Sequence, residues 1–365
     1  MLLCNTKLNI NDKEVSTTSF ILRERVFMAR ETKKLFSTTP EQIAKINPEN
    51  LQLIEEFMDY YEATDHTEKS LKVTRSNLNI FFVWLMEKGR NKDFCNVKKK
   101  DILAFQSYLV KEGLSPARIR ALKSSLSSLS KYIEDILDEE EKWEGFRNIV
   151  NKVPSPVLSP VREKTMLNDD QVVEVLNALV EKKKYQHACA LALAWCSGSR
   201  KAELLRFKMS YINDKNLRFG GNLYMTPEPI KTKGRGKQGK LLEKYILADK
   251  FKPYFDLWQE ERERMGVPST MDEMFITKHG DTFVPMQESH LDSYAKTFSR
   301  MFGCHFYFHC MRHACCTGML RAGLSAQQVC LLFGWASVDM VNVYDDRSKD
   351  EIIGDLFGEG SSIKL

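Results

Sequence analysis

The stretch FHCMRHACCTGMLRAGLSAQQVCLLFGWASVDMVNVYDD, residues 308–346, brings histidines, adjacent cysteines, arginines, a tryptophan and a tyrosine close together in the chain. On a helix, the spacing of His309, Arg312 and His313 by three and four positions places all three side chains on one face. A guanidinium offers a forked set of donors, so this face suits an anion, above all a phosphate that gains charge during a reaction. The stretch therefore predicts a helix that handles phosphate.

Two other kinds of site use the same residue types. A metal site would pair His309 with His313, but HCMRH lacks the glutamate of the HExxH motif and places a permanent cation beside the ion. A nucleophilic cysteine would be Cys315 or Cys316, but both have apolar neighbours, and small buried cysteines explain them better. We therefore expect no metal and no other cofactor, with a zinc-binding protein as an alternative.

The composition is that of a globular chain with room for two domains. It has 365 residues, 43% of them apolar, and 54 basic against 49 acidic side chains, a net charge of +5. This mild excess is compatible with a nucleic-acid partner if the basic residues cluster. The nine cysteines include no CxxC pair, and neither the N-terminus nor the apolar run 188–196 resembles a leader or a membrane span. We expect a soluble cytoplasmic protein with no membrane partner.

Helical periodicity dominates the first part of the chain. An N-terminal extension, residues 1–45, contains one basic segment, 20–36, which is predicted to be helical. Apolar stripes then predict helices near 51–61, 71–85, 102–109 and 115–136. The last of these begins with Ser115 as N-cap and Pro116 at its first position. Residues 46–150 should therefore form an all-helical domain.

The predicted helix after Ser115 has a second, polar face. It carries Arg118 and Lys123 among small hydroxyl side chains. Such a mixture suits contact with DNA phosphates, although a solvated helix face is the plainer interpretation.

A proline-rich linker, residues 151–165, separates this domain from the next. A helix then starts at Asn168, with Gln171 three residues on as in a capping box. The apolar run 187–196 predicts a buried helix that is broken by SGSR at 197–200. Short β-like runs between 212 and 247 flank the basic loop KTKGRGKQGK, and helices follow near 251–265 and from 292 onward.

These motifs resemble those of the tyrosine recombinases, the integrase family that includes Cre and the Xer proteins. HxxRH at 309–313, the GW pair at 334–335 and Tyr344 have the order and spacing of the family's C-terminal boxes, and SGSR resembles its first arginine box. The resemblance implies a mainly α fold. An all-helical core-binding domain would precede a mostly helical, mixed α/β catalytic domain with a small β-sheet, residues 166–348, and a C-terminal tail, 349–365.

The resemblance also implies a mechanism without metal or ATP. Tyr344 would attack a scissile phosphodiester, forming a 3′-phosphotyrosine and freeing a 5′-hydroxyl. Arg200 and Arg312 would clamp the non-bridging oxygens, because a phenol is a poor nucleophile until cations surround its target. His309 would donate to the same oxygens or assist proton transfer. A lysine of the basic loop would protonate the leaving oxygen; Lys233 is the choice and Lys231 its rival.

Other residues would support this site or hold DNA. The Trp335 indole would donate one hydrogen bond and pack against the site, or it is a plain core tryptophan. Glu203 and His313 would orient their neighbours. DNA contacts are expected from the basic loop and the polar helix face, that is, from Lys231, Arg235, Lys237, Arg118 and Lys123.

The expected partner is double-stranded DNA with a specific recombination site, bound by a dimer at each site and a tetramer on two sites, with an accessory or directionality factor and a nucleoid location. The tail, with apolar residues at 352, 353, 356 and 357, would dock on a neighbouring protomer or pack back on its own domain.

Two departures from the family pattern and two rival functions stay open. Asp345 and Asp346 follow the proposed nucleophile and would oppose DNA unless they face away or pair with Arg347. Ser199 stands where an apolar residue is expected. A type IB topoisomerase shares this chemistry, and a DNA-binding regulator with a vestigial site belongs to another class.

Overall fold

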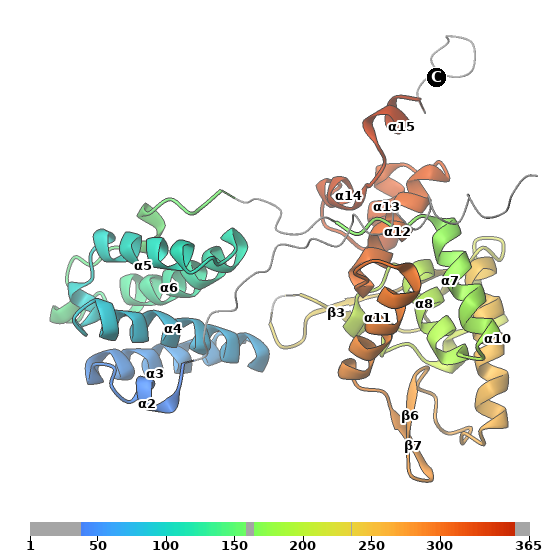
Figure 1. The fold of residues 1–365 in the computed structure, drawn as a ribbon, viewed down its shortest axis with the longest axis horizontal. Coiled ribbons are helices and arrows are strands. Elements are labelled where there is room, and N and C mark those ends of the chain that lie inside the picture. Colours follow the sequence, from blue (N-terminus) through green and yellow to red (C-terminus); the bar gives the residue numbers. More distant parts are fainter. Residues whose placement is uncertain (1–37, 158–163, 235, 355–365) are drawn as a thin grey trace, which may run out of the picture. The chain divides into compact units, whose positions relative to one another are not determined.

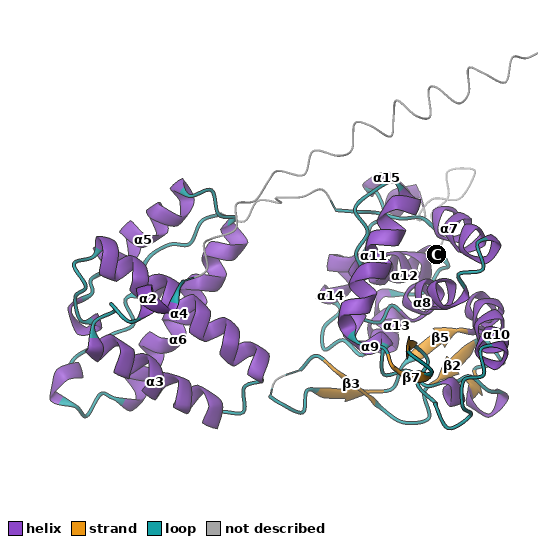
Figure 2. Cartoon of the chain, turned by 60° about the horizontal axis from the view of Figure 1, so that its bottom comes forward, coloured by secondary structure: helices purple, strands orange, loops and turns teal. Residues whose placement is uncertain are grey.

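The computed structural model describes residues 38–157, 164–234 and 236–354, which form two compact units (Figure 1). Each unit has a hydrophobic core of its own. The first comprises residues 38–157 together with residues 234 and 236–239, and the second comprises residues 164–233 and 240–354. Most of the described chain is helical, and short strands occur only in the second unit among the described residues (Figure 2). The predicted fold class, mainly α with a small amount of sheet, is confirmed.

The first unit is entirely helical in its described part. Its helices are α2 (Pro40–Ile43), α3 (Pro48–Ala63), α4 (Glu68–Lys88), α5 (Lys99–Lys111) and α6 (Pro116–Ile136), with short 3₁₀ turns at Phe94–Asn96, Glu141–Trp143 and Val150–Lys152. Ser115 caps α6 as expected, since its Oγ accepts the Arg118 amide at 3.2 Å. The Phe81 ring packs edge-on against Phe94 and Phe105, which ties α4 to the following turn and to α5.

The polar face of α6 differs from the expectation at one residue. Lys123 is only 5% exposed, and its Nζ donates to the Val153 carbonyl at 2.6 Å. Gln106 and Arg120 donate in the same way to the carbonyls of Pro154 and Pro156. The expectation that Lys123 lies on an open face toward DNA is wrong, because its ammonium holds the start of the linker.

The second unit is built around one buried helix. Its helices are α7 (Asp169–Glu181), α8 (Tyr185–Ser197), α9 (Lys201–Leu204), α10 (Ala248–Arg264), α11 (Glu288–Phe302), α12 (Phe308–Arg321), α13 (Ala326–Phe333), α14 (Asp339–Tyr344) and α15 (Lys349–Gly354). Residues 188–196 of α8 are all nearly inaccessible, as their apolar run predicts, and α7, α10 and α12 pack around them (Figure 1). The expected capping box of Asn168 and Gln171 opens α7.

The β-like runs between 212 and 247 form two small antiparallel sheets, one of them a hairpin that carries the basic loop. Strands β1 (Leu217–Arg218), β2 (Leu223–Met225) and β5 (Tyr245–Leu247) pair in the order β1-β2-β5, and β3 (Ile230–Thr232) pairs with β4 (Lys240–Leu242). A third pair, β6 (Ile276–His279) and β7 (Thr282–Pro285), was not predicted. Its signal is the two-residue turn Gly280–Asp281, with φ +57° at Gly280.

Several predicted features lie outside the described residues. These are the basic segment 20–36, Arg235, and the apolar tail residues Leu356 and Phe357. Within the described part of the chain, no helix has the length and apolar character needed to cross a membrane.

Candidate active site

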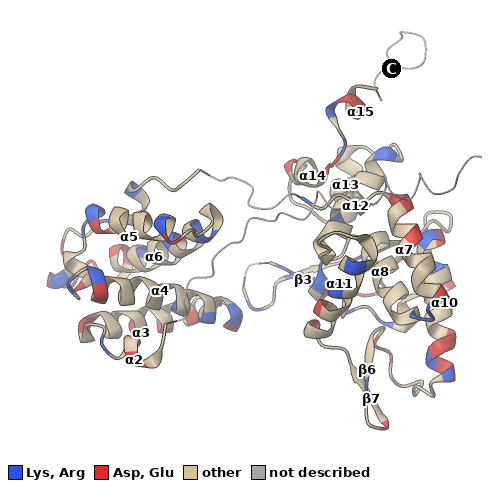
Figure 3. Ribbon diagram, viewed as in Figure 1, with Lys and Arg blue, Asp and Glu red and all other residues tan. Residues whose placement is uncertain are grey.

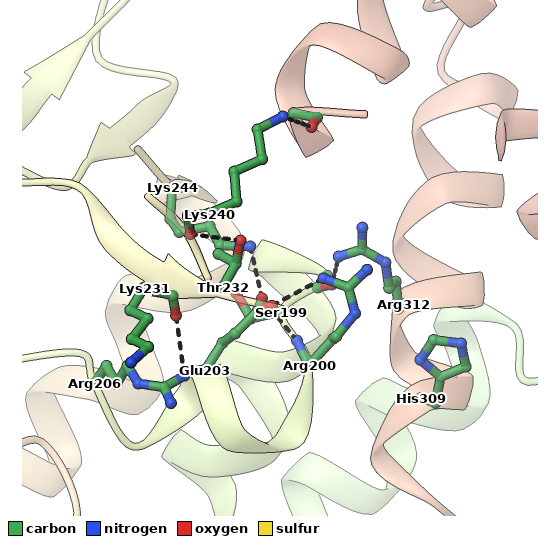
Figure 4. Close-up of polar contacts among 12 residues, drawn as sticks. Ser199, Arg200, Glu203, Arg206, Lys231, Thr232, Lys240, Lys244, His309 and Arg312 are labelled. Carbon is green, nitrogen blue, oxygen red and sulfur yellow. Dashed lines mark hydrogen bonds and ion pairs between the residues drawn. The ribbon is translucent and has the colours of Figure 1, made fainter. Parts of the chain in front are cut away.

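The turn that ends α8 forms one side of the site. Gly198 ends this helix at φ +56°, and a Cβ there would lie 2.5 Å from the Phe333 ring, so only glycine fits. The turn aims the Gly198 carbonyl at α12, where it accepts a hydrogen bond from Arg312 Nη1 at 2.7 Å (Figure 4). The first arginine box and the HxxRH helix are thereby joined.

Arg200 and Glu203 form one unit at the start of α9. Glu203 is 1% exposed, and its carboxylate accepts hydrogen bonds from Arg200 Nη1 at 2.9 Å and from the Arg200 amide at 3.1 Å. The unexpected Ser199 is fully buried and hydrogen bonded to Ser197 Oγ at 2.9 Å. The serine therefore packs without leaving its hydroxyl unsatisfied.

Arg312 is the most deeply buried cation of the site. It is 1% exposed, and its guanidinium carbon lies 4.6, 5.0 and 5.4 Å from the ring centroids of Phe333, Trp335 and Tyr344. Burial lowers the pKa of Arg312, and the positive charge of Arg200 lowers it further. Arg312 therefore holds its charge in a place that water scarcely reaches, while the neighbouring Arg200 side chain is 32% exposed.

Tyr344 ends α14 and lies at the centre of this group. Its ring stacks on Trp335 at 4.9 Å and lies 4.6 Å from the His313 ring. Its hydroxyl is 3.2 Å from Nε2 of His309, one turn before His313 on α12. The structure thus gathers His309, Arg312, His313, Trp335 and Tyr344, with Tyr344 itself only 5% exposed.

His309 lies at the start of α12, where its side chain is exposed and its ring is close to Arg312 and Arg200. Partial burial of the imidazole lowers the pKa of His309 well below the usual 6.5, and His313, Arg312 and Arg200 lower it further. The His309 imidazole is therefore neutral near pH 7, and in the tautomer with its proton on Nδ1 the Nε2 atom accepts a hydrogen bond from the Tyr344 hydroxyl.

The chain after Tyr344 is fixed by hydrogen bonds and ion pairs. Thr317 Oγ1 donates to the Tyr344 carbonyl at 3.1 Å and accepts the Asp346 amide at 3.0 Å. Asp345 pairs with Arg347 at 2.9 Å, and Asp346 pairs with Lys164. Both carboxylates that follow the tyrosine are thus partnered by cations, Asp345 by the expected Arg347 and Asp346 by Lys164.

The β3–β4 hairpin joins the site through β4. Lys240 Nζ donates to the Gly334 carbonyl at 2.9 Å, and a Cβ on Gly334 would lie 2.8 Å from Leu242. Lys233, Lys231 and Lys237 are exposed on the hairpin and its loop, where basic residues gather (Figure 3). The Lys231 side chain extends on the Arg206 side of the hairpin, away from Arg312 (Figure 4).

The sequence predicted most of the residues around Tyr344 but not the residues that hold them in position. Lys233, Lys231 and Lys237 are exposed on the β3–β4 hairpin and its loop, and Arg118 and Lys123 belong to the first unit. Missed were Gly198, Thr317, Lys164 and Lys244, of which only Gly198 has a local signal, a glycine at a helix end. No group of three or more metal-ligating side chains occurs among the residues that the structure describes.

Comparison with known proteins identifies the family. Residues 165–351, about half of the chain, match the phage integrase family. The chain is 29% identical over 290 residues to the SPbeta prophage-derived recombinase-like protein YomM of Bacillus subtilis (strain 168), covering 79% of this chain and 84% of that protein. It is 23% identical over 341 residues to the tyrosine recombinase XerS of Streptococcus uberis, covering 80% and 92%.

Solved structures show the same fold at lower identity. The XerH site-specific recombinase bound to a palindromic difH substrate has a TM-score of 0.58 at 17% identity, covering 91% of each chain. A lambda integrase dimer bound to a COC′ core site has a TM-score of 0.56 at 17% identity, covering 82% of this chain and 96% of that one. With residues 165–351 matching that family, this chain belongs to the phage integrase family and is a tyrosine recombinase, an enzyme that exchanges strands of DNA.

Proposed function

We propose that this recombinase cleaves and rejoins DNA at specific sites through a 3′-phosphotyrosine on Tyr344, without metal or ATP. The observation that carries the proposal is the Tyr344 hydroxyl 3.2 Å from His309 Nε2, enclosed by Arg312 and Trp335. A nucleophile, a base within hydrogen-bond reach and a fixed cation are the parts that covalent phosphoryl transfer requires.

The first step moves two protons and exchanges one bond to phosphorus for another. Neutral His309 accepts the phenolic proton through Nε2 as the Tyr344 oxygen forms a bond to phosphorus. The bond from phosphorus to the 5′ oxygen breaks, and that oxygen takes a proton from a lysine. Attack by a 5′-hydroxyl on the phosphotyrosine reverses each step, so the bond energy is conserved.

Arg312 and Arg200 supply the charge that stabilises the pentacoordinate phosphorus. Arg312 is held by the Gly198 carbonyl, and Arg200 is held by Glu203, so neither has to reorganise during the reaction. Arg312 Nε and Trp335 Nε1 are buried and have no hydrogen-bond partner among the described residues. Both nitrogens can only donate, and non-bridging phosphate oxygens would satisfy them.

Lys233 is the proposed general acid. Its hairpin is fixed beside Trp335 by the contact of Lys240 with Gly334, and Lys233 directly follows β3. Its neighbour Lys231 extends on the Arg206 side, which favours Lys233 over this rival. Both lysines are exposed, so either can move when DNA binds.

The wider assembly follows from the same account. The proposed substrate is duplex DNA with a specific recombination site, held by a dimer, with two such dimers forming a tetramer and an accessory factor setting direction. Arg118, Lys237, Lys231 and Arg235 are the proposed phosphate contacts. In α15, Ile352 and Ile353 are 39% and 41% exposed, which favours docking on a neighbouring protomer. The protein would act at the nucleoid.

The test is to capture the intermediate on DNA of unknown sequence. The protein is incubated in EDTA with fragmented genomic DNA of the organism that carries the gene, stopped with SDS, and the attached DNA is sequenced. We expect adducts at a discrete site that vanish in Tyr344→Phe. Adducts spread over all sequences would favour the topoisomerase reading, and salt-sensitive binding without adducts would favour a regulator.

A further inference from the structure

A buried lysine lies behind the first arginine of the site. Lys244, between β4 and β5, is 4% exposed, and its Nζ lies 2.7 Å from Oε2 of Glu203. Its backbone is fixed to Thr226, whose Oγ1 accepts the Lys244 amide at 3.0 Å and whose own amide donates to the Lys244 carbonyl at 2.9 Å. The ammonium therefore has one defined position.

Glu203 is shared between two cations. One oxygen accepts from Arg200 Nη1, and the other accepts from Lys244 Nζ and the Arg200 amide (Figure 4). Burial raises the pKa of Glu203, but the charge and hydrogen bond of Lys244, with those of Arg200, outweigh this and hold the pKa below its usual value. Burial, together with the charges of Arg312 and Arg200, lowers the pKa of Lys244 more than the charge and hydrogen bond of Glu203 raise it.

We propose that Lys244 is a positioning residue that neutralises Glu203, so that Arg200 keeps its geometry and its positive charge toward the scissile phosphate. The inference rests on the proposed role of Arg200. With Lys244 present, the three side chains carry one net positive charge. Without it, Glu203 would cancel the charge of Arg200 in a low-dielectric site, where such cancellation is strong.

Stability alone is a poor reason for this arrangement. Burying a lysine and a glutamate costs much of what their attraction returns, and apolar side chains of similar size often serve a core better. A third cation beside Arg200 and Arg312 also adds repulsion, which lowers the pKa of Lys244 in addition to the larger effect of its burial. The main effect of Lys244 is therefore to preserve the positive charge of Arg200.

The decisive experiment is a double-mutant cycle between Lys244→Met and Glu203→Gln. A duplex with the site recovered by adduct sequencing serves as substrate, and the single-turnover rate of adduct formation is measured. We expect Lys244→Met to slow the reaction at least about tenfold. In the Glu203→Gln background the same change should have an effect within about twofold, since no carboxylate remains to be neutralised. Lys208→Met is the matched control, because Lys208 also lies 2.7 Å from a glutamate oxygen but is exposed.

Two outcomes would overturn the proposal. One is that Lys244→Met slows the Glu203→Gln variant as much as it slows the unmodified chain. If a 5′-bridging sulfur then restores the rate, Lys244 is a general acid, because a thiolate leaves without a proton. The other is a Lys244→Met rate equal to that of Lys208→Met. The double variant leaves no unpaired buried charge, and in Glu203→Gln the buried Lys244 can lose its proton, because burial lowers its pKa. Their comparison therefore decides the matter even if Lys244→Met alone fails to fold.

The same cycle is run on DNA affinity in the Tyr344→Phe background, which needs no chemistry. There Lys244→Met should weaken binding severalfold and Glu203→Gln should remove that loss. Absence of any adduct with the unmodified chain would count against the phosphotyrosine proposal. Absence of coupling in the affinity cycle would count against Lys244.

Discussion

The hydroxyl of Tyr344 lies 3.2 Å from Nε2 of His309, although the two residues belong to different helices, α14 and α12. The pair brings a nucleophile into contact with an imidazole whose pKa is held low by partial burial and by neighbouring cations. An imidazole that stays neutral can accept the phenolic proton over the whole physiological pH range.

We therefore expect His309 to remain neutral in the free protein between pH 5.5 and 8. In the unfolded chain His309 binds a proton near pH 6.5, but in the folded state it does not. The free energy of unfolding should therefore fall as the pH drops below this value. NMR titration of the imidazole signals measures this, with the His309 signal assigned by its loss in His309→Gln. A titration midpoint at or above 6.5 would contradict the lowered pKa of His309.

Lys233→Ala should slow cleavage by about 10²- to 10⁴-fold, since a general acid contributes about that much. A substrate with sulfur at the 5′-bridging position should restore the rate, because a thiolate leaves without protonation. Lys231→Ala is the matched control and should stay within a few-fold of the unmodified chain on both substrates. The reverse pattern would assign the role to Lys231.

Thr317→Val should destabilise the second unit and slow cleavage. The valine has a similar shape but leaves the Tyr344 carbonyl and the Asp346 amide without their hydrogen bonds, at a cost of about 1–3 kcal/mol. Urea unfolding and single-turnover cleavage measure the two effects, with Thr317→Ser as the control that keeps the hydroxyl. Equal stability and rate in Thr317→Val would show that the tyrosine segment is held by other contacts.

Lys123→Met should leave the salt dependence of DNA binding unchanged, because the ammonium is bound to the Val153 carbonyl inside the first unit. Arg118→Met, on the same helix, should reduce the slope of log K against log salt by about one if Arg118 contacts a phosphate. A reduced slope in Lys123→Met would mean that this side chain leaves its buried position when DNA binds.

The sequence predicted the elements whose signals are local. Ser115 and Asn168 caps, the apolar stripe of α6 and the uniformly apolar α8 all lie where periodicity and capping rules put them. Pairing of strands was less accessible, because β2 pairs with β5 across the β3–β4 hairpin, and nothing in such short runs encodes a partner.

The site, too, contains residues that the sequence could predict and residues that it could not. The spacing of His309, Arg312 and His313 on one helix predicted that they share a face, and their rings and charges do surround Tyr344. Lys244 and Thr317 could not be found in this manner, because a lysine in a β region and a threonine in a helix are ordinary until the fold brings Glu203 and Tyr344 to them. For Lys123, periodicity predicted an open polar face, but its ammonium donates a hydrogen bond to the Val153 carbonyl at the start of the linker.

The most direct test of the central claim is the identity of the residue that carries DNA. Trypsin cuts after Arg321 and Arg347 and releases residues 322–347, in which Tyr344 is the one tyrosine. After adduct formation in EDTA and exhaustive nuclease digestion, mass spectrometry should find nucleotide 3′-phosphate on this peptide, and the cut DNA should carry a free 5′-hydroxyl. Nucleotide on any other peptide, or cleaved DNA with a 5′-phosphate, would contradict a 3′-phosphotyrosine at Tyr344.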